Sequence, residues 1–341
     1  MSIKSRLEEY AALGNKRWHT PGHKGGLDTF DLTEIGEEGG TFPADAIEFA
    51  QNKAARFYGA KHCRFLVNGS SGGIKAAILA ADGDIVAPKA RHRCVDEGAK
   101  LNKVNVFDIE CERLRDGLYA PPSVGDVLKS LEKHKSAKAV VVVSPDYYGV
   151  TACEEIADAV HSAGKMLIAD SAHGAHFAAR SDLFPKGFAA VADFCVMSAH
   201  KTMNAYTQSS YMCINNDEVE AKADECLELL GTTSPSYRLL SGLENAIDFA
   251  EENAHKYDGL KTATDEFRRE IVCLRNNDFT RIAVDAAAYG LTGRELFDRL
   301  YKDGHTAEMT DGRYVVFIAT LADEVGDIVK LKESILRITS R

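Results

Sequence analysis

The sequence of 341 residues has no apolar run long enough to cross a membrane. Its first nine residues, MSIKSRLEE, also lack the apolar core of a signal peptide. We therefore expect a protein that is neither inserted into a membrane nor exported, and we expect cytoplasmic residence.

The chain also lacks paired cysteines and a basic excess. No C-x-x-C pair occurs among its eight cysteines, which argues against a disulfide framework and against a structural zinc site. Acidic residues outnumber basic ones by 51 to 41, and the net charge of −10 argues against a nucleic-acid binder, which would carry a basic stripe. The cysteines are Cys63, Cys94, Cys111, Cys153, Cys195, Cys213, Cys226 and Cys273.

What the sequence does contain, from about residue 44 to 215, is an alternation of strand and helix patterns. Residues 137–143 end in four consecutive valines, which is typical of a parallel strand buried on both faces. The alternation predicts an α/β fold with a doubly wound, mostly parallel sheet. The predicted strands are 64–67, 84–87, 104–107, 137–143, 165–169, 194–197 and 211–214, and the predicted helices are 44–58, 74–81, 124–135 and 154–163.

The pattern changes after residue 215. Helical periodicity dominates at 218–230 and again from 237 to 276, and a compact α+β segment follows. We expect three parts: an N-terminal helix and capping loop over 1–43, a large α/β domain over 44–215, and connecting helices with a small C-terminal α+β domain over 216–341. The predicted elements of the small domain are strands at 281–284 and 314–318 and helices at 292–302 and 324–338, the first of these helices with a capping box from Thr292 to Glu295.

An acid and a lysine follow two strands of the predicted sheet. The strand at 165–169 ends in Asp170, and the strand at 194–197 is followed by Lys201. The carboxyl ends of parallel strands meet at one edge of a sheet, where α/β enzymes bind ligands. Lysine forms Schiff bases with carbonyl cofactors, and a pyridoxal phosphate site pairs such a lysine with a carboxylate at the pyridinium nitrogen. The alternative for Lys201 is a surface lysine that follows a strand, and the alternative for Asp170 is a helix N-cap.

Other candidate loops follow strands at the same edge or precede the sheet. The Gly/Ser segment at 68–73 lies between a strand and a helix, where backbone N–H groups can bind phosphate. The loop at 88–94 carries Arg91, His92 and Arg93, and the residues alone favour its interpretation as a solvated basic loop. Residues 17–26 form an irregular loop, continuing to 43, that is either a polar surface loop or a cap over the site.

Five motifs together resemble the bacterial Orn/Lys/Arg decarboxylase family, which are pyridoxal-phosphate enzymes of fold type I. The resemblance extends from about residue 16 to 338, and the motifs occur in the family's order. They are HTPGHKGG at 19–26, NGSSGG at 68–73, SPDYYGV at 144–150, DSAHGAHF at 170–177 and SAHKT at 198–202.

The resemblance implies a role for each matching residue. Lys201 forms the Schiff base, Asp170 pairs with the ring nitrogen, and His92 stacks on the ring. Further residues are implied as follows: Ser70, Ser71, Ser198 and His200 on the phosphate side, Ala172 beneath the ring, His173 beside the cofactor, Thr233 or Ser234 at the phosphate of a neighbouring subunit, and His23 and Glu308 on the substrate side. We interpret His23 as structural rather than catalytic. No metal is implied, and the expected assembly is a homodimer with the site at its interface.

The resemblance implies decarboxylation of arginine, ornithine or lysine to the amine, the chemistry of polyamine biosynthesis. The alternatives are another pyridoxal-phosphate reaction, such as acyl or amino transfer, and a truncated non-catalytic homologue. Three features depart from the family pattern: the run Arg91-His-Arg-Cys94 around the histidine, Ser171 in place of the acid after Asp170, and a shorter chain.

Overall fold

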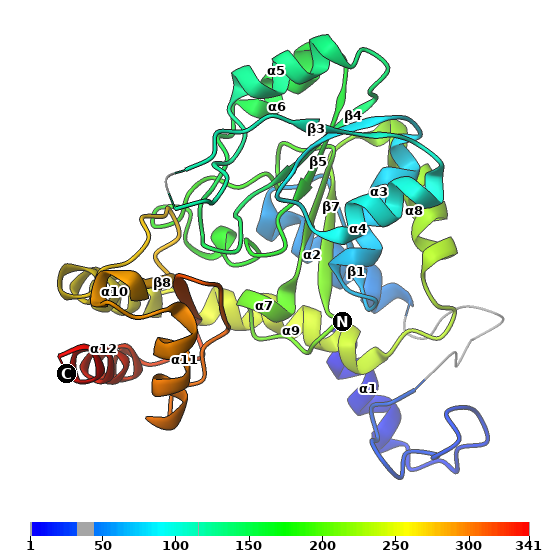
Figure 1. Cartoon of the computed structure of the whole chain (residues 1–341). Coiled ribbons are helices and arrows are strands. Elements are labelled where there is room, and N and C mark those ends of the chain that lie inside the picture. Colours follow the sequence, from blue (N-terminus) through cyan, green and yellow to red (C-terminus); the bar gives the residue numbers. More distant parts are fainter. Residues whose placement is uncertain (1, 33–43, 115, 341) are drawn as a thin grey trace.

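The computed structural model describes residues 2–32, 44–114 and 116–340. Its centre is a seven-stranded sheet in the order β1-β7-β6-β5-β4-β2-β3 (Figure 1). The pairs among β2 to β6 are parallel, whereas β7 runs antiparallel to both β6 and β1. The strands are β1 (His62–Leu66), β2 (Ile85–Pro88), β3 (Val106–Ile109), β4 (Ala139–Val143), β5 (Met166–Asp170), β6 (Phe194–Met197) and β7 (Ser210–Ile214). The predicted mostly parallel α/β sheet is therefore confirmed.

Helices cover both faces of this sheet, because its central strands are apolar on both sides. On β4, Val140 and Val142 pack into one core, whereas Ala139 and Val141 pack into the core on the opposite face. The face that includes Ala139 is covered by α3, α4 and α8, and the other face by α2, α5 and α6 (Figure 1). The helices are α2 (Ala44–Tyr58), α3 (Ser70–Ala81), α4 (Arg93–Asn102), α5 (Val124–Lys133), α6 (Ile156–Ser162), α7 (Ala199–Thr202) and α8 (Asp217–Leu230), with a short 3₁₀ helix η1 (Phe177–Arg180).

A second, smaller sheet lies toward the C-terminus, in the order β8-β10-β9 with antiparallel pairing. It has its own apolar core against α10, α11 and α12. The capping box predicted from Thr292 to Glu295 is confirmed at the start of α11. The elements are α10 (Lys256–Glu270), β8 (Arg281–Asp285), η2 (Ala286–Tyr289), α11 (Gly293–Lys302), β9 (Met309–Thr310), β10 (Tyr314–Ile318) and α12 (Val325–Thr339). The domain boundaries at 43/44 and 215/216 stay a proposal.

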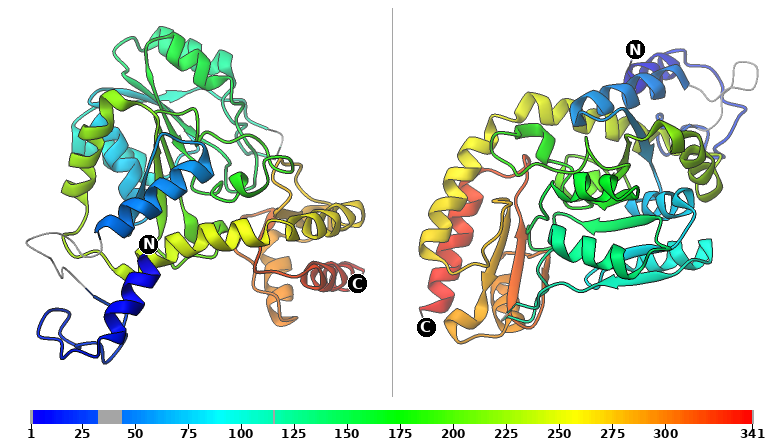
Figure 2. Two further views of the ribbon diagram at one scale, coloured as in Figure 1. Left: turned by 180° about the vertical axis from the view of Figure 1, so that it is seen from behind. Right: turned by 90° about the horizontal axis from the view of Figure 1, so that it is seen from above.

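Two helices connect the parts of the molecule. α1 (Ile3–Ala12) buries Ile3 and Leu7 against α2 and α9 (Tyr237–Asn253). Figure 2 shows α9 running from beside α1 toward the small sheet, where α10 continues. The loop after α1 leaves Trp18 85% exposed. Within the described ranges, no helix is both long and apolar enough to cross a bilayer.

The structure corrects some predicted boundaries. The helix predicted from residue 74 begins at Ser70, so the Gly/Ser segment forms its first turn rather than a loop. Glycine is needed there because a Cβ at Gly73 would lie 2.6 Å from Leu66 Cδ1 and 2.8 Å from Val196 Cγ1. The helical stretch predicted over 237–276 is two helices, and β9 was missed because it has only two residues. The predicted irregular segment over 33–43 lies outside the described residues.

Candidate active site

Nine of the thirteen predicted site residues gather in one cavity of about 480 Å³ at the carboxyl edge of the large sheet. They meet there because β2, β4, β5 and β6 are parallel, and because β1 shares their direction through the antiparallel β7. The cavity is lined by Gly69, Ser70, Ser71, Ala90, Arg91, His92, Cys94, Leu118, Tyr119, Val143, Pro145, Asp146, Tyr147, Tyr148, Asp170, Ala172, His173, Ser198, His200 and Lys201.

Asp170 and Lys201 lie on neighbouring elements of this cavity. Asp170 is the last residue of β5, is only 5% exposed, and its Oδ1 accepts a hydrogen bond from Ala172 N at 3.2 Å. Burial raises the pKa of Asp170, whereas the nearby charges of Lys201 and His92 oppose that rise. Burial lowers the pKa of Lys201, so the site favours the neutral amine that attacks a carbonyl carbon.

His173 lies directly against the lysine. Its Nε2 is 3.1 Å from Lys201 Nζ, and its Nδ1 is 2.9 Å from Arg281 Nη2. The ring of Tyr147 covers it at a centroid distance of 4.5 Å. Burial, together with the charges of Arg281 and Lys201, holds the pKa of His173 well below its ordinary value, so the imidazole is neutral.

An anion site lies at the other end of the cavity. α3 begins at Ser70 after Gly69, whose φ of 79° suits glycine and which has no side chain to cap the helix. The first N–H groups of a helix have no partners within it and attract anions. Ser198 Oγ donates a hydrogen bond to Ser70 Oγ at 2.8 Å, which adds hydroxyls to the same place. His200 is oriented by Nδ1, 3.0 Å from Ser209 O.

This donor set fits pyridoxal phosphate. The cofactor needs a carboxylate for its ring nitrogen, an amine for its aldehyde and an anion site for its phosphate. The buried carboxylate of Asp170, with one hydrogen bond among the described residues, the amine of Lys201 and the N-terminus of α3 line the same cavity. His92 and Ala172 also line this cavity.

Four predicted residues lie outside the cavity lining. His23 Nε2 is 3.0 Å from Asp31 Oδ2 in the loop after α1. Thr233 and Ser234 are exposed on the connection between α8 and α9. Glu308 is close to the site without lining it, since its Oε1 accepts a hydrogen bond from Tyr147 Oη at 2.8 Å. The roles of Thr233 and Ser234 toward a neighbouring subunit stay predictions.

The structure adds two residues that the sequence analysis missed. Cys94 lines the cavity at the start of α4, and burial raises the pKa of its thiol to about 12. Arg281 is fully buried at the start of β8 and contacts His173 from behind. The sequence signal that could have identified Arg281 is its place directly before the apolar stretch Ile-Ala-Val. An arginine next to a buried strand indicates a buried charge, and a buried charge needs specific partners.

Asp146, on the cavity wall, should make stability depend on pH. Its Oδ1 accepts hydrogen bonds from Tyr148 N at 2.9 Å and Val150 N at 2.8 Å, yet burial raises its pKa from 3.8 to about 6. The folded state then holds a proton that the unfolded chain has already lost, so stability falls as the pH rises from 4 to 6. A rise of about two pH units corresponds to about 3 kcal/mol.

We therefore expect the free energy of unfolding of the wild type to fall by about 2 kcal/mol between pH 4 and pH 6, and by about 3 kcal/mol over the whole titration, relative to that of Asp146→Asn, whose side chain does not titrate. Denaturant unfolding at several pH values measures this difference. If the free energies of unfolding of the two proteins changed in parallel with pH, Asp146 would not have a raised pKa in the folded state.

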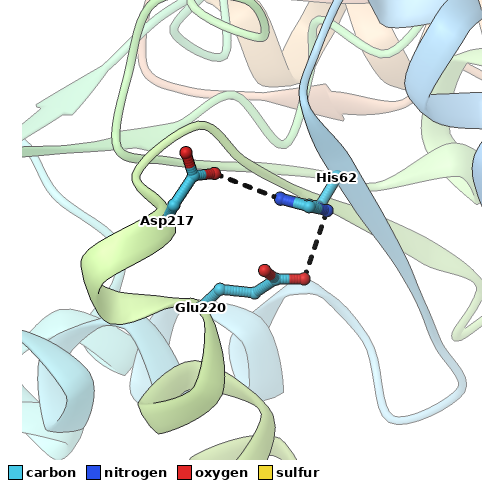
Figure 3. A group of neighbouring side chains, drawn as sticks. All are labelled: His62, Asp217 and Glu220. Carbon is cyan, nitrogen blue, oxygen red and sulfur yellow. Dashed lines mark hydrogen bonds and ion pairs between the residues drawn. The ribbon is translucent and has the colours of Figure 1, made fainter.

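A group of possible metal ligands lies elsewhere on the surface, at His62, Asp217 and Glu220 (Figure 3). The histidine lies between the two carboxylates, with Nε2 3.3 Å from Asp217 and Nδ1 3.1 Å from Glu220. Both carboxylates already have cationic partners at 2.6 Å, Lys61 for Asp217 and Arg64 for Glu220. The group is therefore explained as an ion-pair network without a metal.

Comparison with known proteins gives consistent results. The family profile described as "Orn/Lys/Arg decarboxylase, major domain" matches residues 38–292. An uncharacterised protein of Bacillus subtilis, YaaO, is 32% identical over 70% of this chain and 54% of its own length. The arginine decarboxylase of the same organism is 26% identical over 98% of this chain and 76% of its own length.

The fold is also that of a solved decarboxylase. The crystal structure of the Francisella novicida lysine decarboxylase LdcF superposes with a TM-score of 0.83 at 18% identity, covering 99% of this chain and 60% of that one. The fold type predicted for the large sheet is thus confirmed. The chain spans about half the length of YaaO and three fifths of that of LdcF.

Proposed function

Because the chain belongs to the Orn/Lys/Arg decarboxylase family, we propose that it is a pyridoxal-phosphate enzyme that decarboxylates arginine, ornithine or lysine to the corresponding amine. The observation that carries the proposal is the placement of Asp170 and Lys201 in one cavity with the N-terminus of α3. This arrangement offers a partner to the ring nitrogen, the aldehyde and the phosphate of one cofactor. A surface lysine would not lie near a buried carboxylate and an anion site.

The chain's own residues hold and orient the reactants. When bound, pyridoxal phosphate supplies a carbonyl carbon for the substrate amine and a pyridinium ring that accepts the electron pair left by carbon dioxide. Asp170 would keep the ring nitrogen protonated, and Lys201 would supply the amine that holds the aldehyde. Ser70, Ser71, Ser198 and His200 would hold the phosphate, and His92 and Ala172 would lie against the ring; all six line the cavity.

The proton that replaces the carboxylate comes from the same cluster. Lys201 Nζ would take up the proton that the substrate ammonium loses before its amine reacts, and would return it to the substrate Cα, while His173 Nε2 lies 3.1 Å from Nζ and orients it. Tyr147 packs on His173 and narrows the cavity there, which helps to exclude water.

The substrate's distal cation is directed toward Glu308. This carboxylate accepts a hydrogen bond from Tyr147 Oη, and Tyr147 itself lines the cavity, so the negative charge lies just beyond the cavity wall. A cationic side chain entering past Tyr147 would therefore meet an acid. The proposed assembly is a homodimer in which Thr233 or Ser234 reaches the phosphate of the other subunit.

Assays with three amino acids test the function. The purified protein is mixed with pyridoxal phosphate and with arginine, ornithine or lysine, and carbon dioxide and the amine product are measured. We expect release from at least one of them and none from norleucine, which has the length of lysine without its cation. An absorbance band of the lysine Schiff base without release from any substrate would refute decarboxylation while keeping the cofactor.

A further inference from the structure

Arg281 is a buried guanidinium whose main side-chain partner is a histidine. It is 0% exposed, and Nη2 is 2.9 Å from His173 Nδ1 and 3.4 Å from His173 O. Its Nε and Nη1 have no hydrogen-bond partner among the described residues. Because the side chain of Arg281 contacts the imidazole of His173, it constrains which ring nitrogen of His173 carries the proton.

The constraint follows from donor chemistry. A guanidinium donates and does not accept, and it stays protonated in proteins. Nδ1 of His173 must therefore carry the lone pair, which places the proton of the neutral ring on Nε2. That N–H points at Lys201 Nζ, 3.1 Å away. Since an ammonium has no lone pair to accept it, this contact requires Lys201 to be the neutral amine.

We propose that Arg281 is a positioning residue that locks His173 in its Nε2–H tautomer and thereby holds Lys201 as a free amine. Arg281 itself lies behind His173 and does not line the cavity. The value of a free Lys201 amine rests on the proposed function. The tautomer and the lysine charge, however, are properties of the chain without any cofactor.

The surrounding charges agree with this arrangement. His173 faces Lys201 and Arg281 directly, with His176 and His200 beyond them, and burial together with the charge of the Arg281 guanidinium disfavours a second ring proton. Burial and the charge of Arg281 lower the pKa of Lys201, whereas the carboxylates of Asp170 and Glu308 oppose that lowering. Arg281 is balanced by nearby acids, which are Asp278, Glu308 and Asp146.

Nitrogen-15 NMR of the histidine-labelled chain without cofactor tests the tautomer. The variant His173→Gln identifies which ring signals among those of the eleven histidines belong to His173. We expect a neutral ring with the proton on Nε2, and a protonation midpoint well below that of an ordinary histidine. A proton on Nδ1, or protonation near pH 6.5, would overturn the proposal from the wild type alone.

Variants separate this role from a structural one. Arg281→Met should mix the tautomers or let His173 protonate within about one unit of its ordinary pKa, whereas Arg281→Lys keeps a donor and should keep Nε2–H. Arg313→Met, which breaks the ion pair of Arg313 with Asp285 in the same small sheet, is the control and should change neither signal. An unchanged tautomer in Arg281→Met would overturn the proposal.

Lysine reactivity gives a second readout. Reductive labelling with formaldehyde at several pH values, with the Lys201 peptide followed by mass spectrometry, reports its free-amine fraction. Arg281→Met should raise the labelling midpoint by about one pH unit, which is a tenfold smaller free-amine fraction at a fixed pH below it. Because no cofactor is present, this result is independent of whether the protein decarboxylates any amino acid.

Discussion

Replacing Lys201 with alanine should lower decarboxylation by at least about 10³-fold, since the change removes both the amine that anchors the cofactor and a proton donor to the substrate carbon. The variant should also lose the visible absorbance band of the lysine Schiff base. Steady-state release of carbon dioxide and an absorbance spectrum after gel filtration measure the two effects.

A surface lysine provides the matched control. Lys186 is 80% exposed and pairs only with Glu154 at 3.3 Å among the described residues, so Lys186→Ala should keep both activity and absorbance. Activity within tenfold of the wild type in Lys201→Ala would mean that another group bears the cofactor. Loss of both properties in Lys186→Ala as well would point to general damage to the protein.

Replacing Asp170 with asparagine should lower decarboxylation by about 10²–10³-fold, the usual loss when one preorganised electrostatic group is removed. The amide can still accept the hydrogen bond from Ala172 N, but it cannot keep the ring nitrogen protonated. Lys201 is unchanged, so the absorbance band should remain. Activity assays and spectra of the same preparation separate loss of catalysis from loss of cofactor.

Stability gives this second prediction a further check. Burial of Asp170 with one hydrogen bond costs free energy, so the asparagine variant without cofactor should be at least as stable as the wild type. Asp193→Asn is the comparison, because Asp193 is also buried but bonds His161, Leu167 N and Asn216 away from the cavity. That variant should lose stability and keep activity. The opposite pattern would make Asp170 a structural residue.

Much of the fold and the centre of the site could be predicted from sequence, because they depend on local patterns. Continuous apolar runs identified β4 and β6. The helical spacing of apolar residues identified α2, which ends before Gly59, and an apolar helical run identified most of α3. Once the strands are parallel, the residue that follows each strand is placed at one edge, and this geometry brought Asp170 and Lys201 together.

The remaining features depend on contacts that no local pattern records. Arg281 is 108 residues from His173 in sequence, and only the tertiary fold brings the start of β8 into contact with the loop after β5. The start of α3 at Ser70 was missed because glycines usually signal a loop, whereas here Gly73 is helical because the helix lies so close to Leu66 and Val196. The roles of Thr233 and Ser234 depend on a second subunit.

The central claim is that Lys201 bonds the cofactor, and borohydride reduction tests it most directly. The protein is mixed with pyridoxal phosphate, reduced, digested and analysed by mass spectrometry. We predict one stoichiometric pyridoxyl adduct, on the peptide that contains Lys201. An adduct mainly on another lysine, or scattered substoichiometric labelling of surface lysines, would contradict the account.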